Sequence, residues 1–149
     1  MTSLVKRSVE KVWGKDVLPY PFTTSGGERI GEIWFEPPAS MSSILVKYIF
    51  TSEKLSIQVH PSDGEALAFG EADQGKEECW LVLDAEPGAT LGIGFRERLD
   101  KEALHKAACD GTIEALMEWY PVSPGDFFYI PAGTVHAIGA GVSLIEIKW

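Results

Sequence analysis

Apolar and polar side chains alternate along Leu55-Ser56-Ile57-Gln58-Val59-His60-Pro61. This two-residue period predicts a half-buried β-strand, because successive side chains of a strand point to opposite faces. The apolar residues at 55, 57 and 59 would share one face. Ser56, Gln58 and His60 would share the other, so the strand would carry hydrogen-bonding or metal-ligating groups in a row.

Two later segments repeat this pattern of polar groups beside an apolar strand. Glu78 lies on the same side of its segment as Lys76 and leads into the apolar run of residues 80–83, while His136 follows a turn formed by Pro131 and Gly133. A Gln-x-His pair is a weak signal alone. However, two of the three histidines of the chain fall at the ends of predicted strands beside turn residues, where functional groups tend to lie. The candidate ligands of one divalent metal are Gln58, His60, Glu78 and His136.

The ligand types narrow the choice of metal without deciding it. An amide oxygen, two imidazoles and one carboxylate fit Zn²⁺, and also Fe²⁺, Mn²⁺, Ni²⁺ or Co²⁺. Such a set leaves the ion with a net positive charge and open positions for substrate oxygens. The site would therefore act as a Lewis acid.

Composition limits the class of protein. A chain of 149 residues with 45% apolar residues can bury one core, so we expect a single domain over residues 1–149. The net charge of −9 disfavours nucleic acid or an anionic membrane as a partner. Cys79 and Cys109 form no CxxC pattern and predict neither a disulfide nor a thiolate zinc site. With no signal-peptide or membrane-spanning pattern, we expect a soluble, cytoplasmic protein.

The remaining segments predict a strand-rich domain with one helical insertion. Short edge elements are expected at 11–14 and 31–35, and strands at 43–50, 80–83, 90–95, 127–130 and 142–149. The turn at 86–89 predicts a hairpin. Between residues 100 and 118 the apolar period becomes helical, with Asp100 and Thr112 as candidate caps of two helices. Lys47 is the one charge in an otherwise apolar strand, and a charge there needs a partner. The pattern favours an all-β jelly-roll sandwich or small barrel with a short helical insertion.

The motif Gly125-Asp126-Phe127-Phe128-Tyr129-Ile130-Pro131-Ala132-Gly133-Thr134-Val135-His136 resembles the second conserved motif of the cupin superfamily. More narrowly, the chain is similar to the type I mannose-6-phosphate isomerases in their compact bacterial form. Residues 55–61, 75–80, 131–141 and 144–147 carry the resemblance, in the family's order and spacing. It covers nearly all of the chain from Val12 onward.

The resemblance implies a cupin barrel that holds zinc through Gln58, His60, Glu78 and His136. Family members interconvert mannose 6-phosphate and fructose 6-phosphate by moving a proton between C1 and C2 through a cis-enediol. The matching positions imply that Ser56, Lys47 and Lys76 line the sugar or phosphate region. Glu146 matches an acidic pocket residue and is our candidate general acid/base, with Lys76 as a second catalytic candidate. The implied partner is a small phosphorylated sugar, and a homodimer is left open.

Two other functions stay open from the sequence. The family carries a catalytic arginine beyond the strand of Glu146, and the printed sequence has no counterpart of it. The first alternative is therefore a cupin that binds a metal and a sugar-like ligand with little or no catalysis. A metal-dependent dioxygenase is the second, but it would favour iron and an apolar pocket, whereas lysines stand near the ligand strands.

Overall fold

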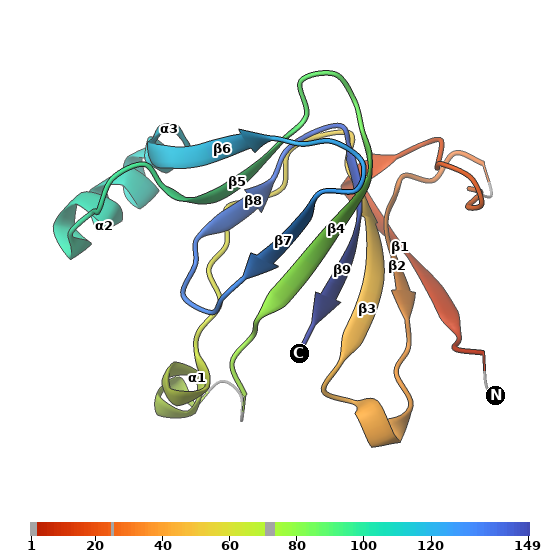
Figure 1. Cartoon of the computed structure of the whole chain (residues 1–149), viewed down its shortest axis with the longest axis horizontal. Coiled ribbons are helices and arrows are strands. Elements are labelled where there is room, and N and C mark those ends of the chain that lie inside the picture. The colour runs from red at the N-terminus through yellow and green to blue at the C-terminus, as the bar shows by residue number, and fades with distance from the viewer. Residues whose placement is uncertain (1–2, 25, 71–73) are drawn as a thin grey trace.

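The computed structural model describes residues 3–24, 26–70 and 74–149. Within these residues the protein contains two antiparallel β-sheets that face each other (Figure 1). The larger has six strands in the order β1-β2-β3-β9-β4-β7, and the smaller has three in the order β6-β5-β8. This arrangement confirms the all-β cupin-type jelly roll predicted from the sequence.

The strands of the large sheet are β1 (Lys6–Lys15), β2 (Ile30–Phe35), β3 (Leu45–Phe50), β4 (Glu78–Ala85), β7 (Phe127–Ile130) and β9 (Val142–Lys148). Those of the small sheet are β5 (Thr90–Phe95), β6 (Met117–Pro121) and β8 (His136–Ile138). The helices are α1 (Asp63–Phe69), α2 (Lys101–Asp110), α3 (Ile113–Leu116) and the 3-10 turn η1 (Ala39–Met41). None of the helices in the described residues is long and apolar enough to cross a bilayer.

The core lies between the sheets. Ile49 of β3, Trp80 of β4 and Leu144 of β9 project from the large sheet, and Leu91 and Ile138 come from the small one. All five are buried in one apolar cluster. The alternation of each strand therefore places every second side chain between the sheets, as it does in other β-sandwiches.

Several strands begin and end where the sequence predicts, and others differ. The strands at 90–95 and 127–130 have the predicted bounds, and the last strand ends one residue early, at Lys148. The segment at 31–35 is not an edge element, because β2 pairs with β1 on one side and β3 on the other. The reason is that residues 6–15 form a ten-residue strand, which covers the edge that β2 would otherwise have.

The prediction of a regular strand at residues 55–61 is wrong. This segment is extended, but its one bridge joins Gln58 to His136, and the two residues exchange backbone hydrogen bonds of 2.9 and 2.8 Å. Leu55 and Ile57 are partly buried as expected, whereas Val59 is 59% exposed. An alternating sequence fixes which way side chains point, but a ladder also needs several consecutive paired residues, and here only Gln58 pairs, with the first residue of β8.

The predicted hairpin at residues 86–89 is also wrong. The turn itself is present, with the Ala89 amide donating to the Glu86 carbonyl over 2.9 Å. The strands that it joins are in different sheets, because β4 pairs with β9 and β7, while β5 pairs with β6 and β8. The turn therefore carries the chain from the large sheet to the small one.

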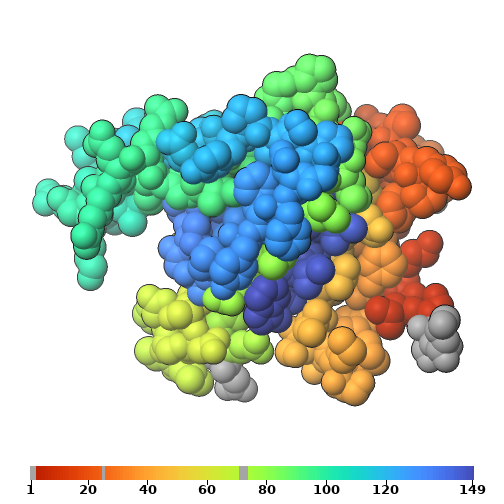
Figure 2. Space-filling view, in the orientation of Figure 1, coloured from red at the N-terminus to blue at the C-terminus, as the bar shows by residue number. Residues whose placement is uncertain are grey.

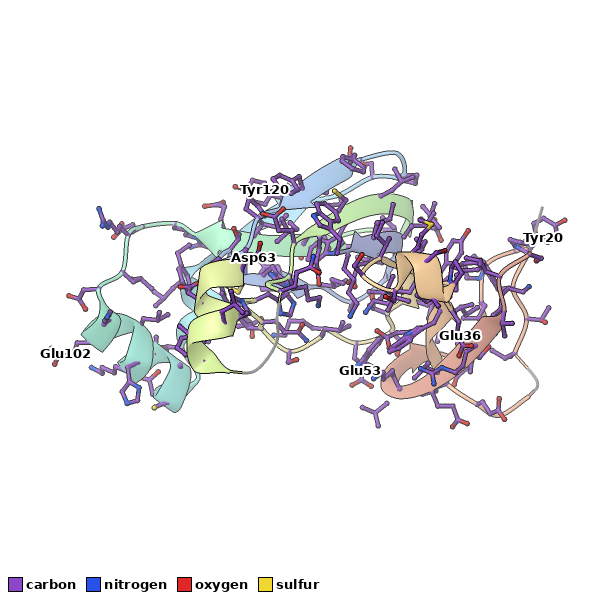
Figure 3. The ribbon with its side chains drawn as sticks, turned by 90° about the horizontal axis from the view of Figure 1, so that it is seen from below. Tyr20, Glu36, Glu53, Asp63, Glu102 and Tyr120 are labelled. Atoms are coloured by element: carbon purple, nitrogen blue, oxygen red, sulfur yellow. The ribbon has the colours of Figure 1, made fainter. Side chains whose placement is uncertain are left out.

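The helical insertion stands away from the two sheets. Asp100 caps α2 as predicted, since its carboxylate accepts a 2.8 Å hydrogen bond from the Ala103 amide, and Ala107 is the one buried residue of that helix. Glu102 points outward at the extremity of the molecule (Figure 3). The space-filling view shows the insertion as a projection at one side (Figure 2). The second predicted helix is short, because Met117 begins β6 instead of extending it.

Candidate functional site

A polar cavity of about 240 Å³ lies at the concave face of the large sheet. The side chains that line it come from six strands, from the extended segment at 55–61 and from Lys76, which lies just before β4. Seven of the eight residues that the sequence singles out line this one cavity: Lys47, Ser56, Gln58, Lys76, Glu78, His136 and Glu146. The eighth, His60, faces a neighbouring hollow, which Lys76 and Lys148 also line. The structure thus brings together groups that are up to 99 positions apart in sequence, from Lys47 to Glu146.

His136 presents one ring nitrogen to the cavity. Its Nδ1 lies 2.8 Å from the Thr134 carbonyl oxygen, which can only accept, so Nδ1 carries the hydrogen. Its Nε2 is buried and has no hydrogen-bond partner among the described residues. Burial lowers the pKa of His136, although the Thr134 carbonyl and Glu78 act in the opposite direction. The ring is therefore neutral near pH 7, with a free lone pair on Nε2.

Glu78 is the buried carboxylate beside this nitrogen. Its Oε2 lies 3.8 Å from His136 Nε2 and accepts a 3.0 Å hydrogen bond from the Trp80 indole, and its Oε1 lies 3.3 Å from His60 Nε2. Lys76 Nζ lies 2.5 Å from Oε1. Burial alone would raise the pKa of Glu78, but hydrogen bonds from His60 and Lys76 and the charge of Lys76 hold it well below its usual range. Glu78 is an anion at neutral pH.

His60, Glu78 and His136 could hold a metal ion together. Their ligand atoms lie within 4.8 Å of one another, which is close enough for the three side chains to share one divalent ion. Lys76 Nζ also lies 2.8 Å from His60 Nε2, so the ammonium is the cation that these groups contact in this structure. The Gln58 side chain lines the same cavity. An imidazole with an orphaned lone pair beside a buried carboxylate is the donor set that a divalent ion requires.

A second buried charge cluster lies at the other side of the cavity. Lys47 of β3 stands directly opposite Glu146 of β9, and the two side chains meet with Nζ 3.0 Å from Oε1. Lys47 Nζ also donates a 2.8 Å hydrogen bond to Glu32 Oε1 on β2. The exposed fraction of each of the three residues is below 9%. The single charge in the apolar strand therefore has two carboxylate partners.

The environment separates the pKa values of the two carboxyl groups. Burial opposes ionisation of Glu32, but Lys47, with further contributions from Trp34 and Lys11, outweighs it and lowers the pKa. Burial raises the pKa of Glu146, and the nearby Glu78 adds to that rise, so the attraction of Lys47 does not restore the usual value. Burial would lower the pKa of Lys47, but Glu146 and Glu32 raise it. Lys47 is therefore a cation held between unequal partners.

Sequence analysis missed three residues of the cavity wall: Lys11, Trp13 and Glu32. Lys11 Nζ lies 3.6 Å from Glu32 Oε2 and 6.0 Å from the centre of the Trp13 ring. A charged residue flanked by Ile30 and Ile33 was a signal of the same kind as Lys47. It was not recognisable as part of the site, because only the pairing of β2 with β3 brings Glu32 to Lys47.

Comparison with known proteins identifies the relatives of the chain. No family model matches it. Over 117 residues, 78% of this chain, it is 39% identical to the mannose-6-phosphate isomerase of Streptococcus mutans, of which it covers 36%. This chain is a homologue of the mannose-6-phosphate isomerases. A second curated homologue, mannose-6-phosphate isomerase ManA of Bacillus subtilis, is 39% identical over 70% of this chain and 33% of its own length.

The solved structures agree with this assignment. The crystal structure of the mannose 6-phosphate isomerase from Bacillus subtilis superposes with a TM-score of 0.83 at 27% identity, over 98% of this chain and 57% of that one. A phosphomannose isomerase from Salmonella typhimurium has the same fold, with a TM-score of 0.74 at 15% identity, over 99% of this chain and 68% of that one. The resemblance predicted from the sequence is confirmed. The chain spans between a third and a half of the length of the curated relatives that it matches.

Proposed function

We propose that this chain binds one divalent metal ion and interconverts mannose 6-phosphate and fructose 6-phosphate. The observation that carries the proposal is the buried, unpaired Nε2 of His136 beside the Glu78 carboxylate, in the same cavity as Glu146. The curated relatives are named for this reaction, which supports the proposal and does not favour a non-catalytic role. A dioxygenase would call for a more apolar pocket than this one.

The charges of the cavity suit a phosphorylated sugar. Three lysines and three glutamates line it, namely Lys11, Lys47, Lys76, Glu32, Glu78 and Glu146, and their formal charges cancel. A divalent ion would leave a local charge of about +2, which complements a phosphate dianion. This local charge explains how a chain with a net charge of −9 would attract an anionic substrate.

The proposed ligands of the ion are Gln58, His60, Glu78 and His136, and zinc is the metal that we propose. The two imidazoles, one carboxylate and one amide oxygen match the nitrogen and oxygen ligands of catalytic zinc sites. When bound, such an ion would stabilise negative charge on the sugar oxygens at C1 and C2.

The chain's own residues would then position the sugar and move one proton. Lys47 and Ser56 would donate hydrogen bonds to sugar oxygens, and Lys76 would bind the substrate and assist catalysis. Glu146 would take the proton from C2 of mannose 6-phosphate and return it to C1. With the hydroxyl proton of O2 passing to O1 in the same conversion, this yields fructose 6-phosphate through a cis-enediol. A buried carboxyl group with a raised pKa suits such a transfer, because its carboxylate is a stronger base than that of an ordinary glutamate.

A coupled assay tests the proposal. Purified chain loaded with one Zn²⁺ should form fructose 6-phosphate from mannose 6-phosphate. In D₂O, the product should incorporate deuterium at C1, because the proton passes through an exchangeable carboxyl group. Glu146→Gln should keep its zinc and lose about 10²- to 10⁴-fold in kcat, the usual contribution of a general acid/base.

A matched control is Glu36→Gln, which changes an exposed carboxylate just beyond β2 and should leave kcat unchanged. The proposal is refuted if the chain holds one zinc per molecule and neither turns over mannose 6-phosphate nor exchanges its C2 proton. Full activity in Glu146→Gln would instead remove Glu146 from the proton transfer.

A further inference from the structure

The bridge between Glu32, Lys47 and Glu146 is unequal. The Lys47 ammonium donates a directed 2.8 Å hydrogen bond to Glu32 Oε1. It lies 3.0 Å from Glu146 Oε1, but that oxygen accepts no well-directed hydrogen bond within the described residues. The ammonium thus makes its better-directed contact with Glu32, while its contact with Glu146 is an ion pair of poorer geometry.

Glu32 also has partners that Glu146 lacks. The Trp34 indole donates a 3.2 Å hydrogen bond to Glu32 Oε2, and Lys11 Nζ lies 3.6 Å from the same oxygen. Two oxygens of one carboxylate therefore have three polar partners, which fix the orientation of the group. Lys47 in turn is held toward β2 by an anchored acceptor.

The other charged groups near Glu146 are few among the described residues. Lys47 faces it from β3, Glu78 comes from β4, Lys76 lies just before β4, and Lys148 is on its own strand. In the sheet, Glu146 stands opposite Lys47 on one side and Trp80 on the other. Among the described residues, Lys47 is the one cation in ion-pair contact with the Glu146 carboxylate, so the position of Lys47 strongly affects the ionisation of Glu146.

We propose that Glu32 is a positioning residue: by engaging Lys47 it keeps the ammonium from pairing fully with Glu146 and leaves Glu146 free to take up and release a proton. A lysine paired with Glu146 alone would hold it as a permanent carboxylate, which is a poor proton carrier. Sharing the lysine with a better-anchored carboxylate weakens that hold. The role of Glu146 as a proton carrier rests on the proposed function. The sharing of the Lys47 ammonium between Glu32 and Glu146 does not, because it is a property of the three side chains.

The pKa shifts of Glu32 and Glu146 are consistent with these two roles, a fixed anion and a proton carrier. Burial opposes ionisation of both, yet the pKa of Glu32 falls while that of Glu146 rises. Two acidic groups whose environments separate their pKa values are the usual arrangement of a fixed anion beside a proton carrier.

Carboxyl titration by NMR tests the inference without reference to activity. Zinc-loaded protein carrying ¹³C at the glutamate carboxyl carbons gives one resonance per glutamate, and loss of a resonance in Glu146→Gln assigns that group. In Glu32→Gln the ammonium can turn to Glu146, so the Glu146 midpoint should fall by about 1 to 3 pH units. The acidic limb of the pH profile of kcat/KM should move by the same amount and in the same direction.

Lys11→Met supplies a test of opposite sign. Without Lys11, Glu32 depends more on Lys47, so the Glu146 midpoint should rise. The Lys11 side chain is 39% exposed. Glu32→Asp keeps the charge and should give a midpoint between those of the wild type and Glu32→Gln. Glu36→Gln, at an exposed position, should leave the midpoint unchanged.

The inference is overturned if Glu32→Gln leaves the Glu146 midpoint unchanged or raises it. If Glu32→Gln does not fold, an unchanged or lowered midpoint in Lys11→Met overturns it in the same way. An inactive wild type would contradict the proposed function alone. The NMR midpoints would still test the inference, because they can be measured whether or not the protein turns over substrate.

Discussion

A buried histidine with one ring nitrogen bound to the backbone has only the other available for chemistry. In His136 the available nitrogen is Nε2, and it points at a carboxylate whose ionised form is strongly favoured. A neutral nitrogen donor beside an anion is a poor arrangement for a structural ion pair, because the ring carries no charge. It is a good arrangement for binding a cation.

Removal of a ligand should therefore lower the metal content. We expect purified His136→Ala and Gln58→Ala each to contain less zinc per chain than the wild type, measured by elemental analysis after dialysis. His105→Ala is the matched control, because His105 is an exposed histidine on α2, away from the cavity. If both ligand variants keep the full zinc content, neither residue is a ligand.

Glu32 should contribute to acid sensitivity. Its pKa in the folded state lies below that of an unfolded chain, so its ionisation stabilises the fold above about pH 4.3. That contribution is lost as the pH falls through the lowered folded-state value. With metal removed from both proteins, the unfolding free energy should fall less steeply in Glu32→Gln than in the wild type when the pH is lowered from 6 to 3 in urea titrations. Equal slopes would show that the Lys47 bridge does not respond to pH in this range.

The sequence singled out residues that the structure brings together, but not the groups around them. Gln58 and His60 are two positions apart, and His136 follows a Pro/Gly turn, so local pattern and family motif both point to them. Lys47 was recognised as a charge that needs a partner. Its partners, Glu32 and Glu146, are 15 residues before it and 99 after it, and strand pairing alone makes them neighbours. Which distant strands become adjacent is decided by the whole core, not by a local period.

At the scale of elements, strands with continuous apolar runs were predicted well and the connections were not. β5 and β7 have the predicted bounds, since nearly all of their residues pair with neighbouring strands. The turn at 86–89 was recognised, but the same turn residues can join strands of one sheet or strands of two different sheets. Residues 55–61 had the period of a strand without a partner of matching length.

The helical insertion should be the most easily loosened element. α2 buries one residue, Ala107, and depends on the Asp100 cap at its start. Asp100→Ala should destabilise α2 by about 1 kcal/mol, seen as faster amide hydrogen exchange in residues 101–110 with no change in zinc content. Glu97→Ala, at an exposed position before the helix, is the control. Faster exchange throughout β4 and β9 would mean that the insertion is coupled to the site.

At the scale of the whole molecule, the sheets share one apolar core and the cavity is built on its inner surface. Trp80 packs in the core and donates from its indole to Glu78, and it stands opposite Glu146 in the sheet. The inner face of β4 and β9 thus carries core residues along one part of its length and the cavity carboxylates, Glu78 and Glu146, along the other. Damage to the core is therefore expected to affect both.

Leu144→Ala should show that the core centres on the inner face of β9. Leu144 is fully buried in the core on β9, two residues before Glu146, and its truncation should cost about 2 to 5 kcal/mol of unfolding free energy. Ile147→Ala on the same strand removes a side chain that is 37% exposed and should cost much less. Urea unfolding followed by tryptophan fluorescence and by far-UV circular dichroism measures both variants. Equal losses would mean that the core does not centre on the inner face of β9.

The irregular backbone at residues 55–61 gives a bound ion a mechanical consequence. Two of the proposed ligands, Gln58 and His60, lie on that segment, and the other two lie at the first residues of β4 and β8. An ion held by all four would cross-link this irregular segment to the strands of both sheets. Binding of the metal would reduce the motion of residues 55–61. Removal of the metal by a chelator would restore that motion, while the two sheets stayed packed together. The part of the cavity wall formed by residues 55–61 would then be rigid only in the metal-bound protein.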